Sequence, residues 1–316
     1  MKISAQFMKN ISGFVLMLFL LAPITVMAQD DIVFIPIVSR AKPLKNIITV
    51  AKAKGDFTDP VAAVNSINDA SAENPYLVVI GPGIYTLTQT LVMKEYVGIL
   101  GSGENFTKLQ GAISTGSIDA SSAVVSGANN VTLSSLTVEN TGGSMYSIAL
   151  YNVNASPTVT NVAATGSGGT ENYGVFNASS SPTMTSVTAT GSGGSYTYGV
   201  RNASSSPTMT SVTAEASGGT YNYSVRNDSS SPTMTNVTAT GSGGLANYGV
   251  INLVSSSPTM RRSTMEGDTY SLYTDSTTAT VSQSTLIGAV HGGTKNTCVA
   301  CDNGSGTALN GNCTTP

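Results

Sequence analysis

The sequence predicts an all-β fold, a parallel β-helix built from ~25-residue coils with three strands per coil. The first observation is a phrase that recurs five times, as SPTVTNVAATGSGG, SPTMTSVTATGSGG, SPTMTSVTAEASGG, SPTMTNVTATGSGG and a decayed SPTMRRSTMEGD. Its prolines recur about every 25 residues, at Pro157, Pro182, Pro207, Pro232 and Pro258. A fixed period of this length is typical of a solenoid, in which each repeat buries its apolar face against the next.

The second observation is that apolar residues recur at fixed places in each coil. Period-two alternation, with a bend at Ser186, turns valine, methionine and alanine to one side of the chain and threonine to the other. Stacking the coils roughly 4.8 Å apart aligns these inward residues in columns. One column is Val124, Leu150, Val175, Val200, Val225, Val250 and Leu272, and another is Leu133, Val159, Met184, Met209, Met234, Met260 and Val281.

The third observation is a polar column within the same pattern. It consists of Asn152, Asn177, Asn202, Asn227 and Asn252. At a strand-to-turn corner, each amide can donate a hydrogen bond to the side-chain oxygen of the next coil, as in the asparagine ladders of stacked strands. We therefore interpret this column as part of the scaffold.

Residues 1–28 have the features of a signal peptide. Lys2 and Lys9 flank the start of an apolar stretch, and Val26-Met27-Ala28 resembles a small-residue cleavage site. The apolar stretch is too short to span a bilayer comfortably, and no later apolar run reaches membrane length. We expect a secreted or extracellular protein, in the periplasm or at the cell surface as alternatives, with no membrane span in the mature chain. One strand and a polar linker are expected in residues 29–45.

Residues 46–121 are expected to form an N-terminal cap and non-repeating coils. Asp59 can cap a helix, and Pro60 suits its first turn. This short amphipathic helix could cover the open end of the solenoid. Strands are expected after it at Tyr76–Ile80, Ile84–Leu87, Leu91–Met93 and Val97–Leu100. The regular repeats then occupy residues 122–290, and a cysteine-containing cap occupies residues 291–316.

The three cysteines all lie in this C-terminal cap. Cys298 and Cys301 have the CxxC spacing of some zinc sites, with Cys313 and His291 as the remaining candidates. Export favours a disulfide instead. We therefore expect Cys313 to pair with either Cys298 or Cys301, and we expect no metal and no cofactor.

The charge of the chain argues against a nucleic-acid partner. The formal net charge is −3, and only 10% of the residues are charged. A weakly acidic chain with scattered basic residues does not provide the basic stripe that nucleic acid requires.

Two parts of the chain resemble a known family. The segment Ile48–Thr58, followed by the helix and by Pro82-Gly83-Ile84-Tyr85, resembles the amino-terminal coils of pectin methylesterases. The asparagine column and the coil length resemble the wider pectin-lyase-like superfamily, whose fold is the right-handed parallel β-helix. The resemblance covers residues 46–290 for the fold and 46–112 for the esterase-like entry. The tail, residues 298–313, resembles the end of uncharacterised secreted bacterial β-helix proteins.

The resemblance also implies what an active enzyme would need. Pectin methylesterases use two aspartates, with glutamines that hold the oxyanion and an arginine nearby. Their aspartate motif is similar to GxxDFIFG, and residues 116–121 keep only Gly116 and Asp119. Asp119 is thus the one catalytic candidate. The repeats also contain no histidine that could activate a serine or threonine.

Three further columns are candidates for ligand binding. Arg201 and Arg226 lie one coil apart, with no acid in their column, and we expect them on the solvent face, where they could contact a carboxylated sugar chain. A TxT double column resembles the ice-contacting faces of some antifreeze proteins, and it includes Thr183, Thr185, Thr208, Thr210, Thr233 and Thr235. A tyrosine column shares the parity of the inward valines, which favours a stack in the core or at its rim: Tyr173, Tyr198, Tyr223 and Tyr248.

These observations favour a secreted, non-catalytic β-helix module, structural or adhesive, that binds an extracellular polysaccharide or cell-surface glycan. One alternative is a carbohydrate-active enzyme of the pectinesterase or pectate lyase type. A third hypothesis is an ice-binding protein that uses the TxT columns. The sequence leaves the oligomeric state open.

Overall fold

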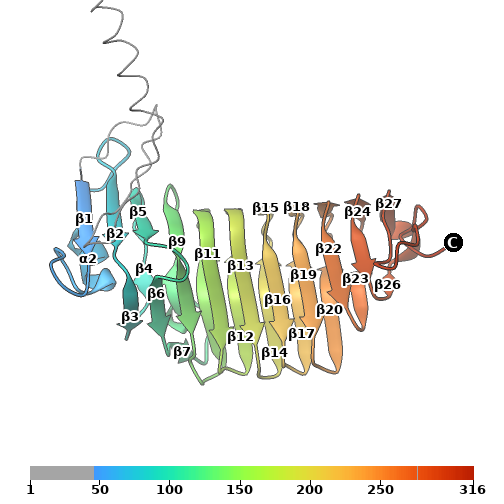
Figure 1. The fold of residues 1–316 in the computed structure, drawn as a ribbon, viewed down its shortest axis with the longest axis horizontal. Helices are drawn as coiled ribbons and strands as arrows, with labels where there is room; N and C mark the ends of the chain where they lie inside the picture. Colours follow the sequence, from blue (N-terminus) through green and yellow to red (C-terminus); the bar gives the residue numbers. More distant parts are fainter. Residues whose placement is uncertain (1–45, 276) are drawn as a thin grey trace, which may run out of the picture. The chain divides into compact units, whose positions relative to one another are not determined.

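The computed structural model describes residues 46–275 and 277–316. The expected signal peptide (1–28) and the strand and linker (29–45) lie outside the described residues. The described chain is a right-handed parallel β-solenoid, and its coils follow one another from β1 to β27 (Figure 1). The predicted fold class is confirmed.

The larger of the two sheets contains seventeen strands, and all its pairings are parallel. They are β1 (Asn46–Val50), β2 (Tyr76–Ile80), β3 (Gly83–Leu87), β5 (Val97–Gly101), β6 (Thr107–Gly111), β9 (Thr132–Asn140), β11 (Thr158–Ser167), β13 (Thr183–Ser192), β15 (Thr208–Thr210), β16 (Thr213–Ser217), β18 (Thr233–Thr235), β19 (Thr238–Ser242), β21 (Thr259–Arg261), β22 (Thr264–Gly267), β24 (Ala279–Ser282), β25 (Thr285–Ile287) and β27 (Asn296–Val299). We call this sheet the large sheet.

The small sheet contains ten strands, and they pair in parallel except where β7 runs antiparallel to β10. They are β4 (Leu91–Val92), β7 (Ser114–Thr115), β8 (Ala123–Ser126), β10 (Tyr146–Val153), β12 (Glu171–Ala178), β14 (Tyr196–Ala203), β17 (Tyr221–Asp228), β20 (Ala246–Leu253), β23 (Tyr270–Thr274) and β26 (Val290–His291). The helical segments are α2 (Pro60–Ser66), η1 (Ala120–Ser122) and η2 (Gly293–Lys295).

A left-handed residue bends every regular coil within the large sheet. Ser186 has φ 52° at the predicted bend, and it divides β13 into two straight halves. The corresponding residues of the other coils also have positive φ, and they are Ser135, Asn161, Ser211, Asn236, Arg262 and Gln283. Each coil therefore has three straight segments, two in the large sheet and one in the small sheet.

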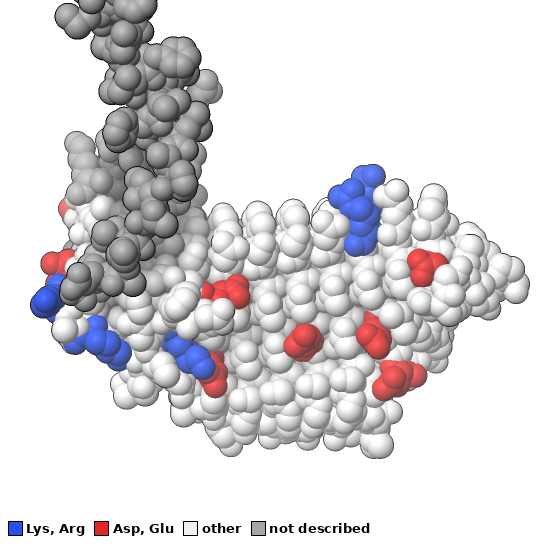
Figure 2. Space-filling view, viewed as in Figure 1, with Lys and Arg blue, Asp and Glu red and all other residues white. Residues whose placement is uncertain are grey.

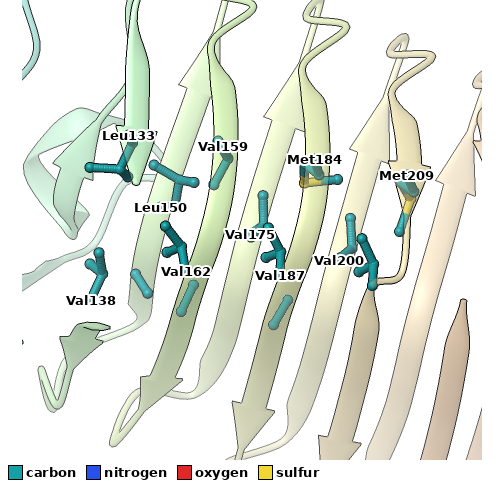
Figure 3. Close-up of a cluster of buried hydrophobic side chains, with 14 of the residues drawn as sticks. Leu133, Val138, Leu150, Val159, Val162, Val175, Met184, Val187, Val200 and Met209 are labelled. Carbon is teal, nitrogen blue, oxygen red and sulfur yellow. The ribbon is translucent and has the colours of Figure 1, made fainter. Parts of the chain in front are cut away.

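The core lies between the sheets, and its side chains stack from coil to coil. Val159, Met184 and Met209 project from the large sheet toward the valines of the small sheet (Figure 3). The methionine column has the predicted register throughout. The valine column needs one correction, because Leu150 pairs with Val125 and not with Val124, although all three residues are buried.

The asparagine ladder is confirmed. The Nδ2 atom of each asparagine donates to the Oδ1 atom of the next at 2.8–2.9 Å, from Asn152 through to Asn252. A second ladder, not predicted from the sequence, lies at the following turn, where the amide of Ser180 donates to Ser205 Oγ at 3.0 Å and the pattern continues to Ser256. Buried donors at both corners are thus satisfied by the neighbouring coil, which resists a slip in register.

The two ends of the described solenoid are covered. At the N-terminal end, Asp59 caps α2 by accepting from the Val61 amide at 2.9 Å, as predicted, and α2 packs beside β1, β2 and β4. At the C-terminal end, Cys298 and Cys313 form a disulfide with a Cα–Cα distance of 5.1 Å. Cys298 continues the methionine column by pairing with Val281, and the free Cys301 is buried in the same core.

Candidate functional site

The tyrosine column stacks as predicted, but it lies on the outer side of the small sheet, in a buried cluster separate from the core of inward valines. Period-two alternation fails at Gly174, where a Cβ atom would lie 2.5 Å from the Thr190 amide across the interior. Gly174 and Val175 therefore both face inward, and Tyr173 faces outward with Phe176. The equivalent inward positions in other coils hold the small residues Ala149, Gly199, Ser224 and Gly249. This column of small residues is the signal that could have revealed the reversal.

We call the outward side chains of β10, β12, β14, β17, β20, β23 and β26 the aromatic face. Cross-strand pairing arranges them in three columns along the solenoid. The first is Tyr146, Glu171, Tyr196, Tyr221 and Ala246; the second is Ile148, Tyr173, Tyr198, Tyr223, Tyr248 and Tyr270; the third is Tyr151, Phe176, Arg201, Arg226, Ile251, Tyr273 and His291. The sequence predicts the second column as aromatic and places Tyr196 and Tyr221 of the first column near it, but it does not reveal the third column.

The rings of the aromatic face stack on one another from coil to coil. In the second column, ring centroids lie 4.5 Å apart between Tyr173 and Tyr198 and 5.1–5.9 Å apart through to Tyr270. In the first column, Tyr196 and Tyr221 stack at 5.1 Å and are 36% and 38% exposed. Tyr173, Tyr198 and Tyr223 are buried, so the ring edges and hydroxyls that the face offers to a ligand come from the exposed Tyr196 and Tyr221 and from partly buried rings such as Tyr248.

Two arginines lie in the middle of the aromatic face, and although their own column contains no acid, as predicted, both lie beside the carboxylate of Asp228. Arg226 binds Asp228, two residues further along the same strand, through Nε and Nη2 at 3.0–3.2 Å. Arg201 places Nε 3.4 Å from the same carboxylate and donates from Nη1 to the Tyr173 hydroxyl at 3.3 Å. Their side chains are only 24% and 23% exposed. Asp228 lies in a different column from the arginines, so a comparison of equivalent positions in the repeats does not reveal these pairs.

The arginines also pack against the rings. The Arg201 guanidinium lies 5.4 Å from the Tyr198 ring centroid and 5.7 Å from that of Phe176, and Arg226 lies 5.5 Å from Tyr223. These are cation–π distances. Burial opposes the charge of Arg226, but the hydrogen bonds and negative charge of Asp228 outweigh it and raise the pKa of this guanidinium.

The buried phenols of the face remain protonated at physiological pH. Burial raises the pKa of Tyr198 to about 12. Burial and the neighbouring Tyr198 also raise the pKa of Tyr173 far above its usual value. The Tyr173 hydroxyl donates a hydrogen bond to the Glu171 carboxylate. The buried phenols beneath the aromatic face are therefore neutral, and the charges of Glu171 and Asp228 are held in place by hydrogen bonds.

Asp119, the catalytic candidate, is a helix-capping residue at the edge of the aromatic face. It caps η1, where its Oδ1 atom accepts from the amide and the hydroxyl of Ser121. Burial, and then the negative charge of Asp119, raise the pKa of the Tyr151 hydroxyl. Asp119 thus lies on the same side of the solenoid as the arginine pair, and its Oδ1 atom is engaged with Ser121.

The threonine columns lie on the outer face of the large sheet, away from the arginines. Thr183, Thr208 and Thr233 are exposed and in register, and Thr185, Thr210 and Thr235 form the partly buried neighbouring column. The exposed column is longer than the repeats suggested, with eight threonines in register: Thr132, Thr158, Thr183, Thr208, Thr233, Thr259, Thr280 and Thr297. Charged side chains are sparse over the face of the coils visible in Figure 2.

Two negative findings apply to residues 46–275 and 277–316 only. No group of three or more histidine, cysteine, aspartate or glutamate side chains in this part is arranged to hold a metal ion. None of the helices in it combines the length and apolar character needed to cross a membrane.

Comparison with solved structures identifies the fold. A pectin methylesterase from carrot superposes with a TM-score of 0.52 at 13% sequence identity, covering 85% of this chain and 86% of that one. The chain has the pectin-lyase-like β-helix fold. An Aspergillus niger pectin methylesterase is similar with a TM-score of 0.48 at 12% identity, covering 84% of this chain and 86% of the other. No protein-family profile and no curated protein sequence matches the chain.

The pectin-lyase-like fold explains the solenoid and its ladders, but at this identity it carries no activity to the chain. The residues that could act on a ligand are those described above. They form two separate surfaces, the aromatic face on the small sheet and the threonine columns on the large sheet. The structure brings together Arg201, Arg226 and the tyrosines, and it separates them from the threonines.

Proposed function

We propose that this protein is a secreted, non-catalytic module that binds an extracellular polysaccharide on its aromatic face. The observation that carries the proposal is the stacked tyrosine array that continues over successive coils and presents the exposed ring pair of Tyr196 and Tyr221. Tyrosine supplies contact area and a hydroxyl at a low cost in conformational entropy, and stacking lowers that cost further. The repeat of roughly 4.8 Å between coils suits a polymer whose own units repeat along the solenoid axis.

The fold is compatible with this proposal. The carrot protein with the same fold is named a pectin methylesterase, and thus acts on a polysaccharide. The enzymatic alternative finds less support in the arrangement of the side chains. The oxygens of Asp119 and Asp228 already cap η1 and bind arginine, respectively. General acid–base chemistry would need a second positioned group beside one of them.

The proposal predicts that removing the exposed ring pair weakens binding without unfolding the protein. We expect Tyr196→Ala/Tyr221→Ala to lower the affinity for a bound polysaccharide roughly tenfold or more, because buried aromatic contacts dominate such interfaces. Affinity gel electrophoresis against a panel of soluble plant and bacterial polysaccharides measures this. Thr183→Ala/Thr208→Ala, which removes two side chains from the large sheet, is the matched control and should bind normally.

The same preparations test the enzymatic alternative. We expect no release of methanol or of new reducing ends from pectin or polygalacturonate. Turnover that disappears in Asp119→Ala would contradict the non-catalytic proposal and favour an esterase. Equal affinities of the tyrosine variant and the threonine control would place the binding surface elsewhere.

The eight-threonine column favours a second candidate function, binding to ice. Exposed threonines at a constant spacing present methyl and hydroxyl groups on rigid strands, and the outward position of Thr208 lies near the middle of the column. If this function exists, the protein should inhibit ice recrystallisation, and Thr208→Lys should abolish the inhibition by inserting a charged side chain into the array. Ser204→Lys, on an exposed turn, should leave it intact. Ice growth indistinguishable from that in an inert protein solution would eliminate this candidate.

A further inference from the structure

We propose that the aromatic face selects neutral polysaccharides and disfavours polyanionic ones. This inference rests on the proposed function, because it names the class of glycan that the same surface binds. It follows from the way in which the charges on the face are already paired. The two arginines that would attract an acidic polymer are engaged with groups of the protein.

The guanidinium of Arg226 is committed to the Asp228 carboxylate. Its Nε atom lies 3.0 and 3.2 Å from the two carboxylate oxygens, and Nη2 lies 3.1 Å from Oδ1. A pair of this geometry is the usual arrangement for carboxylate recognition by arginine. Capturing a sugar carboxylate here would require Asp228 to be displaced from its partner.

Arg201 is also engaged from several sides. It lies between the Phe176 and Tyr198 rings, 5.7 and 5.4 Å from their centroids, and its Nη1 atom donates to Tyr173. Its Nε atom is 3.4 Å from Asp228 without the alignment of a hydrogen bond. One carboxylate therefore neutralises part of the charge of both arginines, and the rings screen the remainder from the surface.

The carboxylates around the face outnumber its guanidinium groups. Besides Asp228, Glu171 lies in the first column and pairs directly with Tyr196 in the next coil. Asp119 lies close enough to Tyr151 for its charge to raise the pKa of that hydroxyl. A polyanion lying along the tyrosines would pass these two carboxylates, and like charges at short range are repulsive. Neutral hydroxyls would instead meet phenolic hydroxyls.

Pairs of polymers that share a backbone and differ in the charge of their substituents test this inference. The first pair is hydroxyethyl cellulose and carboxymethyl cellulose, and the second is fully methyl-esterified and de-esterified homogalacturonan. Affinity gel electrophoresis of the full mature chain at low salt gives the dissociation constant for each polymer. For a backbone that the face accepts, we expect the neutral member to bind at least about tenfold more tightly than the anionic member.

A charge-neutralising variant identifies the responsible carboxylate. Glu171→Gln keeps an acceptor for the Tyr173 hydroxyl, and we expect it to raise the affinity for the anionic polymer, relative to that for the neutral polymer, roughly threefold or more at low salt. Glu215→Gln makes the same charge change at an exposed site on the large sheet and should alter neither affinity. Circular dichroism of each variant verifies that the β structure is retained.

The outcomes separate this inference from the proposed function. Tighter binding of the neutral member, with the Glu171→Gln effect, supports both. Equal binding of both members of a pair, or preference for the anionic member, overturns the selectivity and leaves the polysaccharide-binding function standing. If Glu171→Gln and Glu215→Gln raise the affinity for the anionic polymer equally, the selectivity does not come from the carboxylates of the aromatic face, and this part of the inference is overturned. Absence of binding to all four polymers by the folded protein overturns both proposals.

Discussion

Replacing Asn202 with aspartate is expected to lower the free energy of unfolding by about 3 kcal/mol at neutral pH. Asn202 is fully buried, donates to Asn227 at 2.9 Å and accepts from Asn177 at 2.9 Å. A carboxylate can still accept from Asn177, but it places an acceptor against the Asn227 oxygen and buries a charge with no cation beside it. Urea or thermal unfolding followed by circular dichroism measures the loss.

The pH dependence of Asn202→Asp tests the cause. Burial should raise the pKa of the introduced carboxyl above its unfolded value of about 3.9, so the folded variant holds its proton more tightly than the unfolded chain. Its stability deficit should therefore be smallest near pH 3 and grow as the pH rises above about 4. Ser204→Asp, at an exposed turn residue with φ 50°, is the control for charge. Equal unfolding midpoints for the two variants at neutral pH would contradict the prediction that the asparagine ladder stabilises the fold.

Loss of the Cys298–Cys313 disulfide is the second large effect that we expect. The bridge closes a loop of 15 residues, which in the chain-entropy model contributes about 3 kcal/mol. It also holds the tail over the last coil. Cys298 lies in the last strand, β27, and its amide donates to the Gly311 carbonyl of the tail at 2.9 Å. Opening the bridge should expose the end of the core and the unpaired strand edges there.

The free thiol complicates this test, so Cys301→Ala serves as the background. Cys301→Ala should keep the bridge, and peptide mapping should recover Cys298 linked to Cys313. Adding Cys313→Ala should lower stability by about 3 kcal/mol relative to that background. Hydrogen exchange should show the loss concentrated in β24, β25 and β27, because each coil of a solenoid contacts only its neighbours. An unchanged exchange rate in these strands would show that the tail does not stabilise the last coil.

Much of the fold could be predicted because its information is periodic. The Met184 column, the Asn202 ladder and the Ser186 bend all repeat with the coil. A wrong assignment in one coil would therefore disagree with the equivalent positions in the other coils. Predictions for unrepeated features rested on local chemistry. Asp59 was recognised as a cap because its neighbour is proline, and that cap is present. The register of Val124 was wrong where the regular repeat begins, because no earlier coil confirms the spacing.

The candidate site was less predictable, for a geometric reason. Alternation predicts the side of each residue only while the strand is regular, and the reversal at Gly174 moves Tyr173 from the inner side of the small sheet to its outer side. Arg226 and Arg201 both bind Asp228, which lies in a different column of the small sheet. A column-by-column comparison of the sequence cannot show such contacts, because it aligns equivalent positions and ignores diagonal neighbours.

The sequence by itself determined the stack of coils, the asparagine ladder and the capping of the helix, because these depend on period, alternation and local hydrogen bonding. Only the tertiary structure decided which face carries the tyrosines, which of two cysteines pairs with Cys313, and how the arginine charges are neutralised. Each of these depends on the direction of a side chain after one local irregularity or one turn. Such directions arise from the packing of neighbouring coils, and the one-dimensional pattern does not contain them.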